Sequence, residues 1–362
     1  MSKFGSYSTD DVVFLLKDIS DDIQEQGNEE RERKIQGGTH YSEMIPIEYQ
    51  VSDEYLELYR DKLTETKDKL AFSIGVMCEK IIAKNGRDVV LASLARAGIP
   101  IGILAKRYLK KRYNLELPHY TISIIRDKGI DQNAIKYILE NHSNSKIQFI
   151  DGWTGKGTIS RELDRACEDL GEKYGRKFDS TLAVLADPAG YSGLYGIRED
   201  FLIPSACLNS TVSGLVSRTV LRDDLIGEED FHGAKFYKHL LEHDESNKYL
   251  DTIESCFKGQ YDNIDAEMKY WSADEITKVG GLDVEMIMDK YDIEDVNFIK
   301  PGVGEATRVL LRRIPYKILV RDMEDESLAH IFVLAKEKGV EVVQEDLNAY
   351  RCCGIIKNLK EV

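Results

Sequence analysis

The segment from Lys146 to Thr158, KIQFIDGWTGKGT, constrains the fold more strongly than any other part of the chain. Its apolar residues predict a short strand that ends at Asp151, then a loop rich in glycine and threonine, then a helix. Gly155 and Gly157 let a ligand approach the backbone, and the amides of a helix N-terminus attract anions. Walker A spacing cannot be fitted to this loop. The pattern favours an anion-binding loop, and an ordinary strand-to-helix connection is the alternative.

A second strand, turn and helix precede this loop in the sequence. The run VVLASLARAGIPIGILAKRYLKKRY, from Val89, predicts a buried strand, a turn of small residues with Arg96 and Gly98, and a helix with a basic far face. Arg96 is either a solvated arginine or an anion ligand. A cation at a helix N-terminus is unfavourable unless an anion neutralises it, so we favour the ligand role.

Two more strands are expected to end at the same edge of the sheet. Residues 120–125 form one, followed by a charged turn in which Arg126 and Lys128 either cover a ligand or lie on the surface. The strand in STLAVLADPAG ends at Asp187, which we therefore expect on the same rim as Asp151.

Composition predicts a cytoplasmic protein of two or more domains. The chain has 362 residues, 42% of them hydrophobic, and lacks an apolar run near the roughly 20 residues that a membrane span needs. The N-terminus lacks signal-peptide features, and STDDVVFLL, from Ser8, reads as a capped helix. The 6 cysteines have no CxxC spacing, so neither a zinc site nor a disulfide framework is supported, and we expect mostly buried thiols.

The net charge of −15 disfavours general polyanion binding, but the C-terminal part is locally basic. Residues 241–295 form an acidic, helix-rich connector that is broken at Gly280 and Gly281. Residues 296–362 alternate strands and helices and predict a small α/β/α domain.

The run KPGVGEATRVLLRR in this domain resembles the Pelota and kink-turn RNA-binding superfamily. Gly304 replaces an asparagine of that pattern, which removes a base-reading amide, so salt-dependent phosphate contacts are expected. A capped helix with a basic outer face is the alternative. The resemblance implies an RNA-binding surface formed by Gly302, Glu305, Thr307, Arg308, Arg312 and Arg313.

The loop at 151–158 resembles the phosphoribosyl diphosphate signature of type I phosphoribosyltransferases. Asp151 matches the second acid and Thr158 the closing threonine, whereas Ile150 stands in place of the first acid. Together with GGTHYSEMIPIEY, from Gly37, and REDFLIPSACLNSTVSGLVSRTVL, from Arg198, the chain is similar to the StiP family. That family is a bacterial phosphoribosyltransferase fused to a Pelota domain, also labelled cysteine protease, and linked to tellurite and stress response.

The resemblance implies a phosphoribosyltransferase-like α/β domain with an N-terminal helical hood at residues 1–240. It further implies Mg²⁺-dependent transfer from phosphoribosyl diphosphate to an unidentified base, and a homodimer is compatible with it. The implied diphosphate site comprises Ser93, Arg96, Ala97, Gly98, Asp151, Gly152, Thr154, Gly155, Lys156, Gly157 and Thr158. The implied catalytic residues are Asp151, Arg96, Arg126 and Asp187, with Asp151 and Asp187 as metal ligands. The implied base and hood residues are His40, Tyr41, Glu43, Asn209, Ser210 and Arg218.

Two other functions remain open at this point. One is a cysteine hydrolase with Cys207 as nucleophile, which needs an imidazole that only folding could bring from His40, His119 or His232. The other is a nucleotide-sensing RNA-binding protein without catalysis, which the loss of the first acid at Ile150 favours.

Overall fold

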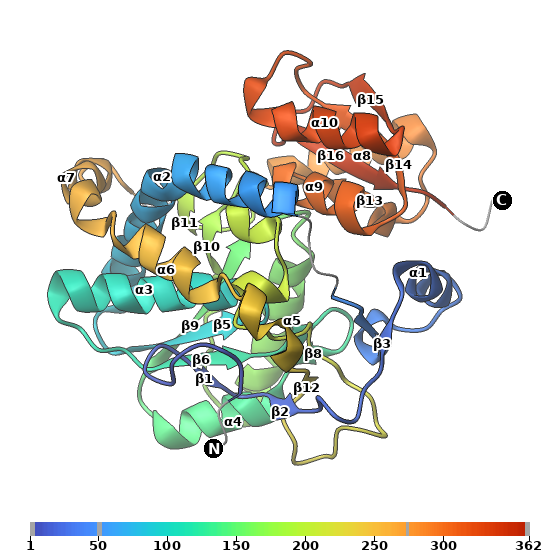
Figure 1. Cartoon of the computed structure of the whole chain (residues 1–362). Coiled ribbons are helices and arrows are strands. Elements are labelled where there is room, and N and C mark those ends of the chain that lie inside the picture. The colour runs from blue at the N-terminus through green and yellow to red at the C-terminus, as the bar shows by residue number, and fades with distance from the viewer. Residues whose placement is uncertain (1–3, 49–52, 273–274, 359–362) are drawn as a thin grey trace.

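The computed structural model describes residues 4–48, 53–272 and 275–358, and two sheets organise it (Figure 1). The larger sheet is parallel, in the order β1-β6-β5-β9-β10-β11. Its strands are β1 (Val13–Phe14), β5 (Val89–Leu94), β6 (His119–Ile122), β9 (Lys146–Trp153), β10 (Ala183–Ala186) and β11 (Leu194–Ile197).

Helices cover both faces of this sheet, which explains why β5, β6 and β10 are buried at every position. Alternate residues of β5 face opposite sides, so Val89 and Leu91 enter one core while Val90 and Ala92 enter the other. On the first side lie α2 (Asp53–Asn85), α3 (Gly98–Tyr113), α6 (Ser246–Glu254) and α7 (Phe257–Met268), and on the second lie α4 (Gln132–Asn141) and α5 (Thr158–Tyr174).

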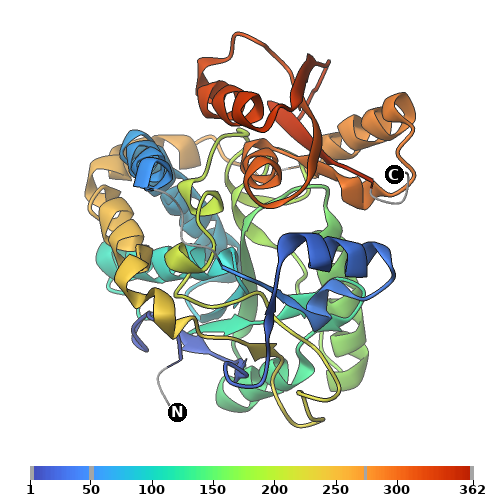
Figure 2. The same ribbon diagram turned by 45° about the vertical axis from the view of Figure 1, so that its right-hand side comes forward.

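The smaller sheet belongs to the C-terminal part, in the order β13-β16-β14-β15. Helix α8 packs on one of its faces and α9 with α10 on the other, as Figure 2 also shows. The elements are α8 (Val279–Tyr291), β13 (Ile299–Pro301), α9 (Val303–Arg312), β14 (Pro315–Val320), α10 (Ala329–Lys338), β15 (Glu341–Gln344) and β16 (Cys352–Ile356).

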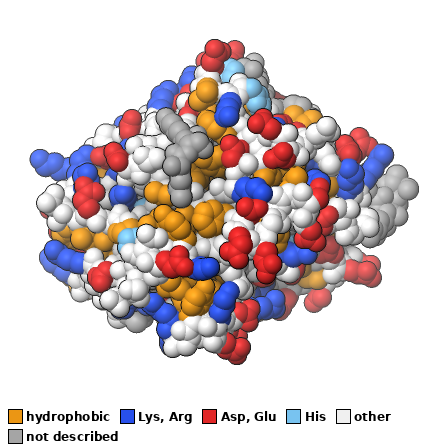
Figure 3. Space-filling view, turned by 90° about the horizontal axis from the view of Figure 1, so that it is seen from below, with side chains coloured by type: hydrophobic (Ala, Val, Ile, Leu, Met, Phe, Trp, Pro, Cys, Tyr) orange, Lys and Arg blue, Asp and Glu red, His pale blue; other side chains and the backbone are white. Residues whose placement is uncertain are grey.

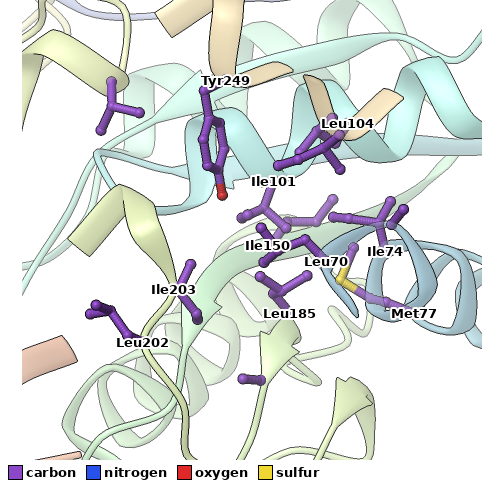
Figure 4. Packing of buried hydrophobic residues seen from close by; sticks show 14 of the residues in the cluster. Leu70, Ile74, Met77, Ile101, Leu104, Ile150, Leu185, Leu202, Ile203 and Tyr249 are labelled. Atoms are coloured by element: carbon purple, nitrogen blue, oxygen red, sulfur yellow. The ribbon is translucent and has the colours of Figure 1, made fainter. Parts of the chain in front are cut away.

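One apolar core runs from the large sheet into the C-terminal domain. Leu70 of α2 and Ile101 of α3 meet Ile150 of β9 in this core (Figure 4). The same cluster includes Val303 and Ala306 of α9, so the helical face of the small domain is buried against the first domain. The α9 helix is therefore fixed by packing as well as by polar contacts.

A hood of short elements lies beside the C-terminal domain (Figures 1 and 2). It contains α1 (Asn28–Gln36), the paired strands β3 (Glu25–Gln26) and β4 (Ile45–Pro46), and a single 3-10 turn at 41–43. Two further short pairs join β2 (Lys17–Asp18) to β12 (Gly233–Ala234) and β7 (Ile124–Ile125) to β8 (Gly129–Ile130). In the described part of the chain, no helix has the length and apolar character needed to cross a bilayer.

The parallel sheet and the C-terminal α/β domain are confirmed, but three local predictions are wrong. The helix expected from Ser8 is a turn followed by β1, because the backbone there pairs with β6. The strand expected at 120–125 is split, since β7 leaves β6 to pair with β8. Gly280 and Gly281 begin α8 rather than breaking a helix, and a side chain on Gly280 would meet the Tyr350 ring.

Gly98 offers a test of the close packing between α3 and β9. A Cβ at this position would lie 2.4 Å from the Ile150 carbonyl oxygen and 3.1 Å from the Asp151 Cα, and neither backbone atom can move aside. Gly98→Ala should therefore lower the free energy of unfolding by about 2 kcal/mol in urea titrations. The control Gly259→Ala, in α7 with no atom within 4 Å of the added Cβ, should raise it by about 0.5 kcal/mol. Equal effects of the two substitutions would contradict this packing.

Candidate functional site

The loops after β5 and β9 meet at one edge of the parallel sheet, because the carboxyl ends of adjacent parallel strands lie together. Gly157 has a φ of 72°, and a Cβ there would lie 2.4 Å from the Tyr191 ring, so the loop needs glycine at this point. The predicted diphosphate-loop residues Arg96, Ala97, Asp151, Thr154, Gly155, Lys156, Gly157 and Thr158 all line one hollow of about 490 Å³.

This hollow opens into a second one of about 980 Å³, and both lie between the first domain and α9. The two share Arg96, Asn209 and Arg218 from the first domain and Arg308 and Arg313 from the C-terminal part. We call their combined space the interdomain cleft. The α1 helix forms another wall, through Arg31 in the larger hollow and Glu32 in the smaller one.

Glu48 organises the first-domain wall of the cleft. It accepts hydrogen bonds from Arg96 Nη1 at 3.3 Å, Asn209 Nδ2 at 3.2 Å and Ser210 Oγ at 3.2 Å. Burial alone would raise the pKa of Glu48, but Arg96 and Arg312 outweigh it and hold the pKa below its ordinary value. The carboxylate therefore stays charged, and Arg96 is already neutralised.

Asp151 lies in the cleft without a cation in salt-bridge distance among the described residues. Its Oδ1 accepts a hydrogen bond from the Gly152 amide at 2.8 Å. Burial raises the pKa of Asp151 to about 7, although the Gly152 amide and Arg308 oppose the shift. At neutral pH the Asp151 side chain is therefore present both as the acid and as the carboxylate. Ile150, at the position of the missing acid, is fully buried in the core.

Arg126 and Lys156 connect the sheet edge to the C-terminal part. Arg126 Nη1 donates to Asn297 Oδ1 at 2.5 Å, and its backbone amide donates to the Tyr41 hydroxyl at 2.8 Å. Lys156 Nζ donates to the carbonyls of Val296 and Ile299. Burial and Arg126 lower the pKa of Lys156 to about 8. These predicted ligand-binding cations are therefore engaged in interdomain contacts.

The basic face of α9, predicted to contact RNA, lies along the cleft. Arg308 pairs with Glu305 at 2.8 Å and reaches Asn209 Oδ1 at 3.4 Å. Arg312 Nη2 donates to the Cys207 carbonyl at 3.0 Å, and Arg313 pairs with Glu32 at 2.6 Å. The described conformation thus turns these cations toward the first domain.

Several predicted site residues lie away from the cleft. Ser93 Oγ is buried against His119 Nε2 at 2.5 Å, and Thr307 is buried beside His330. His40 Nδ1 contacts Ser42 Oγ at 2.8 Å. The residues that do not line either hollow are Ser93, Gly98, Gly152, Asp187, His40, Glu43, Ser210, Gly302 and Thr307.

The donor set does not fit the Mg²⁺ site expected from Asp151 and Asp187. Asp187 is fully buried and already accepts hydrogen bonds from Thr154 Oγ1 and the Tyr191 and Ser192 amides. It also pairs with Arg198 at 2.6 Å. Over residues 4–48, 53–272 and 275–358, no group of three or more His, Cys, Asp or Glu side chains is placed to hold a metal ion.

Cys207 adjoins the cleft at the end of the 3-10 turn Pro204–Ala206. Its carbonyl accepts hydrogen bonds from Tyr55 and Arg312, both at 3.0 Å, and both of these side chains line the larger hollow. The thiol itself is fully buried, and burial raises its pKa to about 11. No hydrogen bond joins a histidine ring to a cysteine sulfur in the described structure, because His40, His119 and His232 bond elsewhere.

Sequence reasoning missed Arg31, Glu48 and Lys300 as parts of this site. Arg31 belongs to NEERERKIQ, whose dense charges are typical of a solvated helix. Glu48 is the penultimate residue of the GGTHYSEMIPIEY block, and nothing in the surrounding sequence distinguishes this glutamate from one on the surface.

Comparisons with known proteins cover nearly the whole chain. Residues 5–254 match the family model described as tellurite-like stress resistance cysteine protease StiP, and residues 278–358 match the PELOTA RNA binding domain. The chain is 34% identical to the cysteine protease StiP of Acinetobacter baylyi over 371 residues, which cover 98% of this chain and 94% of that protein.

These findings contradict the prediction of Mg²⁺-dependent phosphoribosyl transfer, because they name a cysteine protease. They give no support to phosphoribosyl diphosphate or a base as ligands, and a phosphoribosyltransferase fold is not confirmed. The geometry supplies two physical reasons. The first ribose-binding acid is replaced by the buried Ile150, and Asp187 is already paired with Arg198.

The raised pKa of Asp151 makes stability depend on pH. The folded state binds more protons than the unfolded state between about pH 4 and 7, so its stability falls as pH rises through this window. Asp151→Asn should remove that loss and raise the free energy of unfolding at pH 8 by on the order of 2 kcal/mol, with little change at pH 4. Urea titrations at both pH values check this. The control Asp169→Asn, at an exposed position on α5, should show no such difference between the two pH values. A lower stability of Asp151→Asn at pH 8 would contradict the assignment.

Proposed function

Because the chain belongs to the StiP family of tellurite-like stress resistance cysteine proteases, we propose that it hydrolyses peptide bonds with Cys207 as nucleophile. The observation that supports this choice of thiol is its position next to the interdomain cleft. Tyr55 and Arg312, which hold its carbonyl, and Leu208 and Asn209, which follow it, all line the cleft.

The other cysteines are placed less well for this role. Cys78 is fully buried between α2 and α3, where its thiol contacts the Ala105 carbonyl. Cys352 and Cys353 are buried in β16, and Cys167 packs in the core beneath α5. Cys256 is partly exposed, but it lies between α6 and α7, away from the cleft.

The reaction needs a thiolate and a group that takes its proton. The thiolate sulfur would attack the peptide carbonyl carbon, the C–N bond would break as the amine leaves with a proton, and water would then hydrolyse the thioester. His330 lines the same cleft, and burial lowers the pKa of its ring to about 4, so the ring is neutral at pH 7. It would accept a proton only once the cleft opens, because contact with water raises its pKa toward the ordinary value. We assign the proton acceptor to His330.

The closed conformation keeps this thiol inactive. With a pKa of about 11, roughly one Cys207 in ten thousand is a thiolate at pH 7, and its side chain is fully buried. Substrate binding must therefore displace the Tyr55 and Arg312 side chains from the Cys207 carbonyl and open the cleft. Opening would return the thiol to water and lower its pKa toward the ordinary value.

The nucleophile is tested with fluorescently labelled casein as substrate. Cys207→Ala should abolish hydrolysis, and His330→Gln should reduce it by about 100-fold or more, because each removes one partner of the proton transfer. Cys256→Ala, at a partly exposed thiol away from the cleft, should retain wild-type activity. Circular dichroism melts show that the variants are folded. Hydrolysis by the folded Cys207→Ala protein would exclude this thiol as nucleophile.

We also propose that residues 278–358 bind structured RNA. The match to the PELOTA RNA binding domain supports this, as does the row of arginines on α9. On the face seen in Figure 3, Lys and Arg side chains are interspersed with Asp and Glu. A polyanion therefore finds its best match along the cleft side of α9.

RNA binding is tested in filter-binding assays with a kink-turn RNA. Arg308→Gln should weaken retention several-fold and flatten its dependence on salt, because one phosphate contact is lost. Lys336→Gln, at an exposed position on α10, should bind like the wild type. Equal retention by the wild type and Arg308→Gln at all salt concentrations would place the RNA elsewhere.

A further inference from the structure

The interdomain cleft contains a group of arginines with too few acids to neutralise them. Three of its carboxylates are each paired with one arginine: Glu48 with Arg96, Glu305 with Arg308, and Glu32 with Arg313. Within the described ranges, no carboxylate lies in salt-bridge distance of Arg31, Arg218 or Lys300, all of which line the cleft.

Two of these guanidinium groups also leave buried nitrogen atoms without a hydrogen-bond partner. Arg218 Nη1 and Arg31 Nε are shielded from solvent and unbonded in the described structure. The Arg218 guanidinium stacks on the Tyr41 ring at 5.0 Å, which fixes its position without neutralising it. Buried polar atoms normally find partners, so these two nitrogens indicate a missing acceptor.

Mutual repulsion within the group supports the same conclusion. Burial and the positive charges of Arg31, Arg313 and Arg96 together lower the pKa of Arg218 to about 9. Burial and Arg313 lower the pKa of Arg31 to about 10. All four side chains line the larger hollow, and they come from α1, the loop after β5, residue 218 and the end of α9. The unliganded protein keeps this arrangement at a cost in stability.

We propose that Arg31, Arg96, Arg218 and Arg313 form a binding site for a phosphate group held between the two domains. Each phosphate of an RNA backbone carries one negative charge, so two neighbouring phosphates or one doubly charged free phosphate would relieve the repulsion, whereas a single carboxylate would leave most of it in place. Its tetrahedral oxygens accept hydrogen bonds from several guanidinium groups at once. This site does not depend on the proposed peptide hydrolysis.

An RNA backbone is the source of phosphate that the structure favours. Arg313 belongs to the part of the chain that matches the PELOTA RNA binding domain, and the cleft, with hollows of about 980 and 490 Å³, has room for more than a free phosphate ion. The first domain then contributes Arg31, Arg96 and Arg218 to the RNA site. An RNA phosphate at this point would bridge the hood, the sheet edge and α9.

The test compares Arg218→Gln with Arg222→Gln in the full chain. Arg222 is the matched control because its guanidinium pairs with Asp224 outside the cleft. Without ligand, Arg218→Gln should melt at or above the wild-type temperature, because repulsion is relieved. A purely structural role on the Tyr41 ring would lower the melting temperature instead.

Binding is then measured with two probes that separate the sources of phosphate. Inorganic pyrophosphate should raise the melting temperature of the wild type and Arg222→Gln but not of Arg218→Gln. A single-stranded RNA oligonucleotide should bind Arg218→Gln at least tenfold more weakly, with a logarithmic salt slope smaller by about 0.7. If Arg218→Gln loses only the stabilisation by pyrophosphate, the site binds small phosphates. If Arg218→Gln also binds RNA more weakly, or loses RNA binding alone, the site binds the RNA backbone.

Three outcomes would overturn the proposal. They are unchanged binding of both probes to Arg218→Gln, no binding of either probe to the wild type, and tighter binding of polyglutamate than of both phosphate probes. Arg31→Gln is the second variant should Arg218→Gln fail to fold, and the same losses are expected for it. Unchanged RNA retention by Arg308→Gln would contradict the RNA proposal and leave the pyrophosphate result intact, so the two proposals are separable.

Discussion

The carboxylate of Asp200 joins the two domains, and the geometry of the cleft depends on this junction. Its Oδ1 accepts a hydrogen bond from the Val303 amide at 3.0 Å, at the start of α9, and its Oδ2 accepts one from the Arg351 amide at 2.8 Å, just before β16. Burial raises the pKa of Asp200 to about 6, although the two amides and Arg351 oppose the shift. One acid from the first domain thus satisfies the N-terminus of the helix that carries the cleft arginines.

Apolar packing and charge act differently at this junction. The shared core places α9 against the first domain without setting which residues meet across it. Two polar contacts determine how the first domain is placed against the small domain. Arg313 forms an ion pair with Glu32 of the hood, and Arg126 at the sheet edge donates to Asn297. Because α9 also shares an apolar core with the first domain, opening of the cleft has to separate part of that core as well as these polar contacts.

Local patterns were enough to predict the elements that carry the loops. Buried β-branched runs followed by small residues led to β5 with α3 and β9 with α5, whereas the order of the strands in the sheet was not predicted. The cleft itself could not be predicted, because its chemistry comes from segments far apart in the sequence. Periodicity showed that Arg308 and Arg312 share a face of α9, but it does not say whether that face meets solvent or another domain. Here it meets Cys207 and Glu48.

The assignment of function failed for a related reason. A glycine-rich loop after Asp151 predicts where an anion could approach, and that prediction does not identify the reaction. The residues that decide the chemistry lie on the opposite wall. Arg312 holds the Cys207 carbonyl and also stabilises the charge of Glu48, which pairs with Arg96. Arg96 and Arg312 therefore act on the same carboxylate, which links the charge at the sheet edge to the side chain that holds the Cys207 carbonyl.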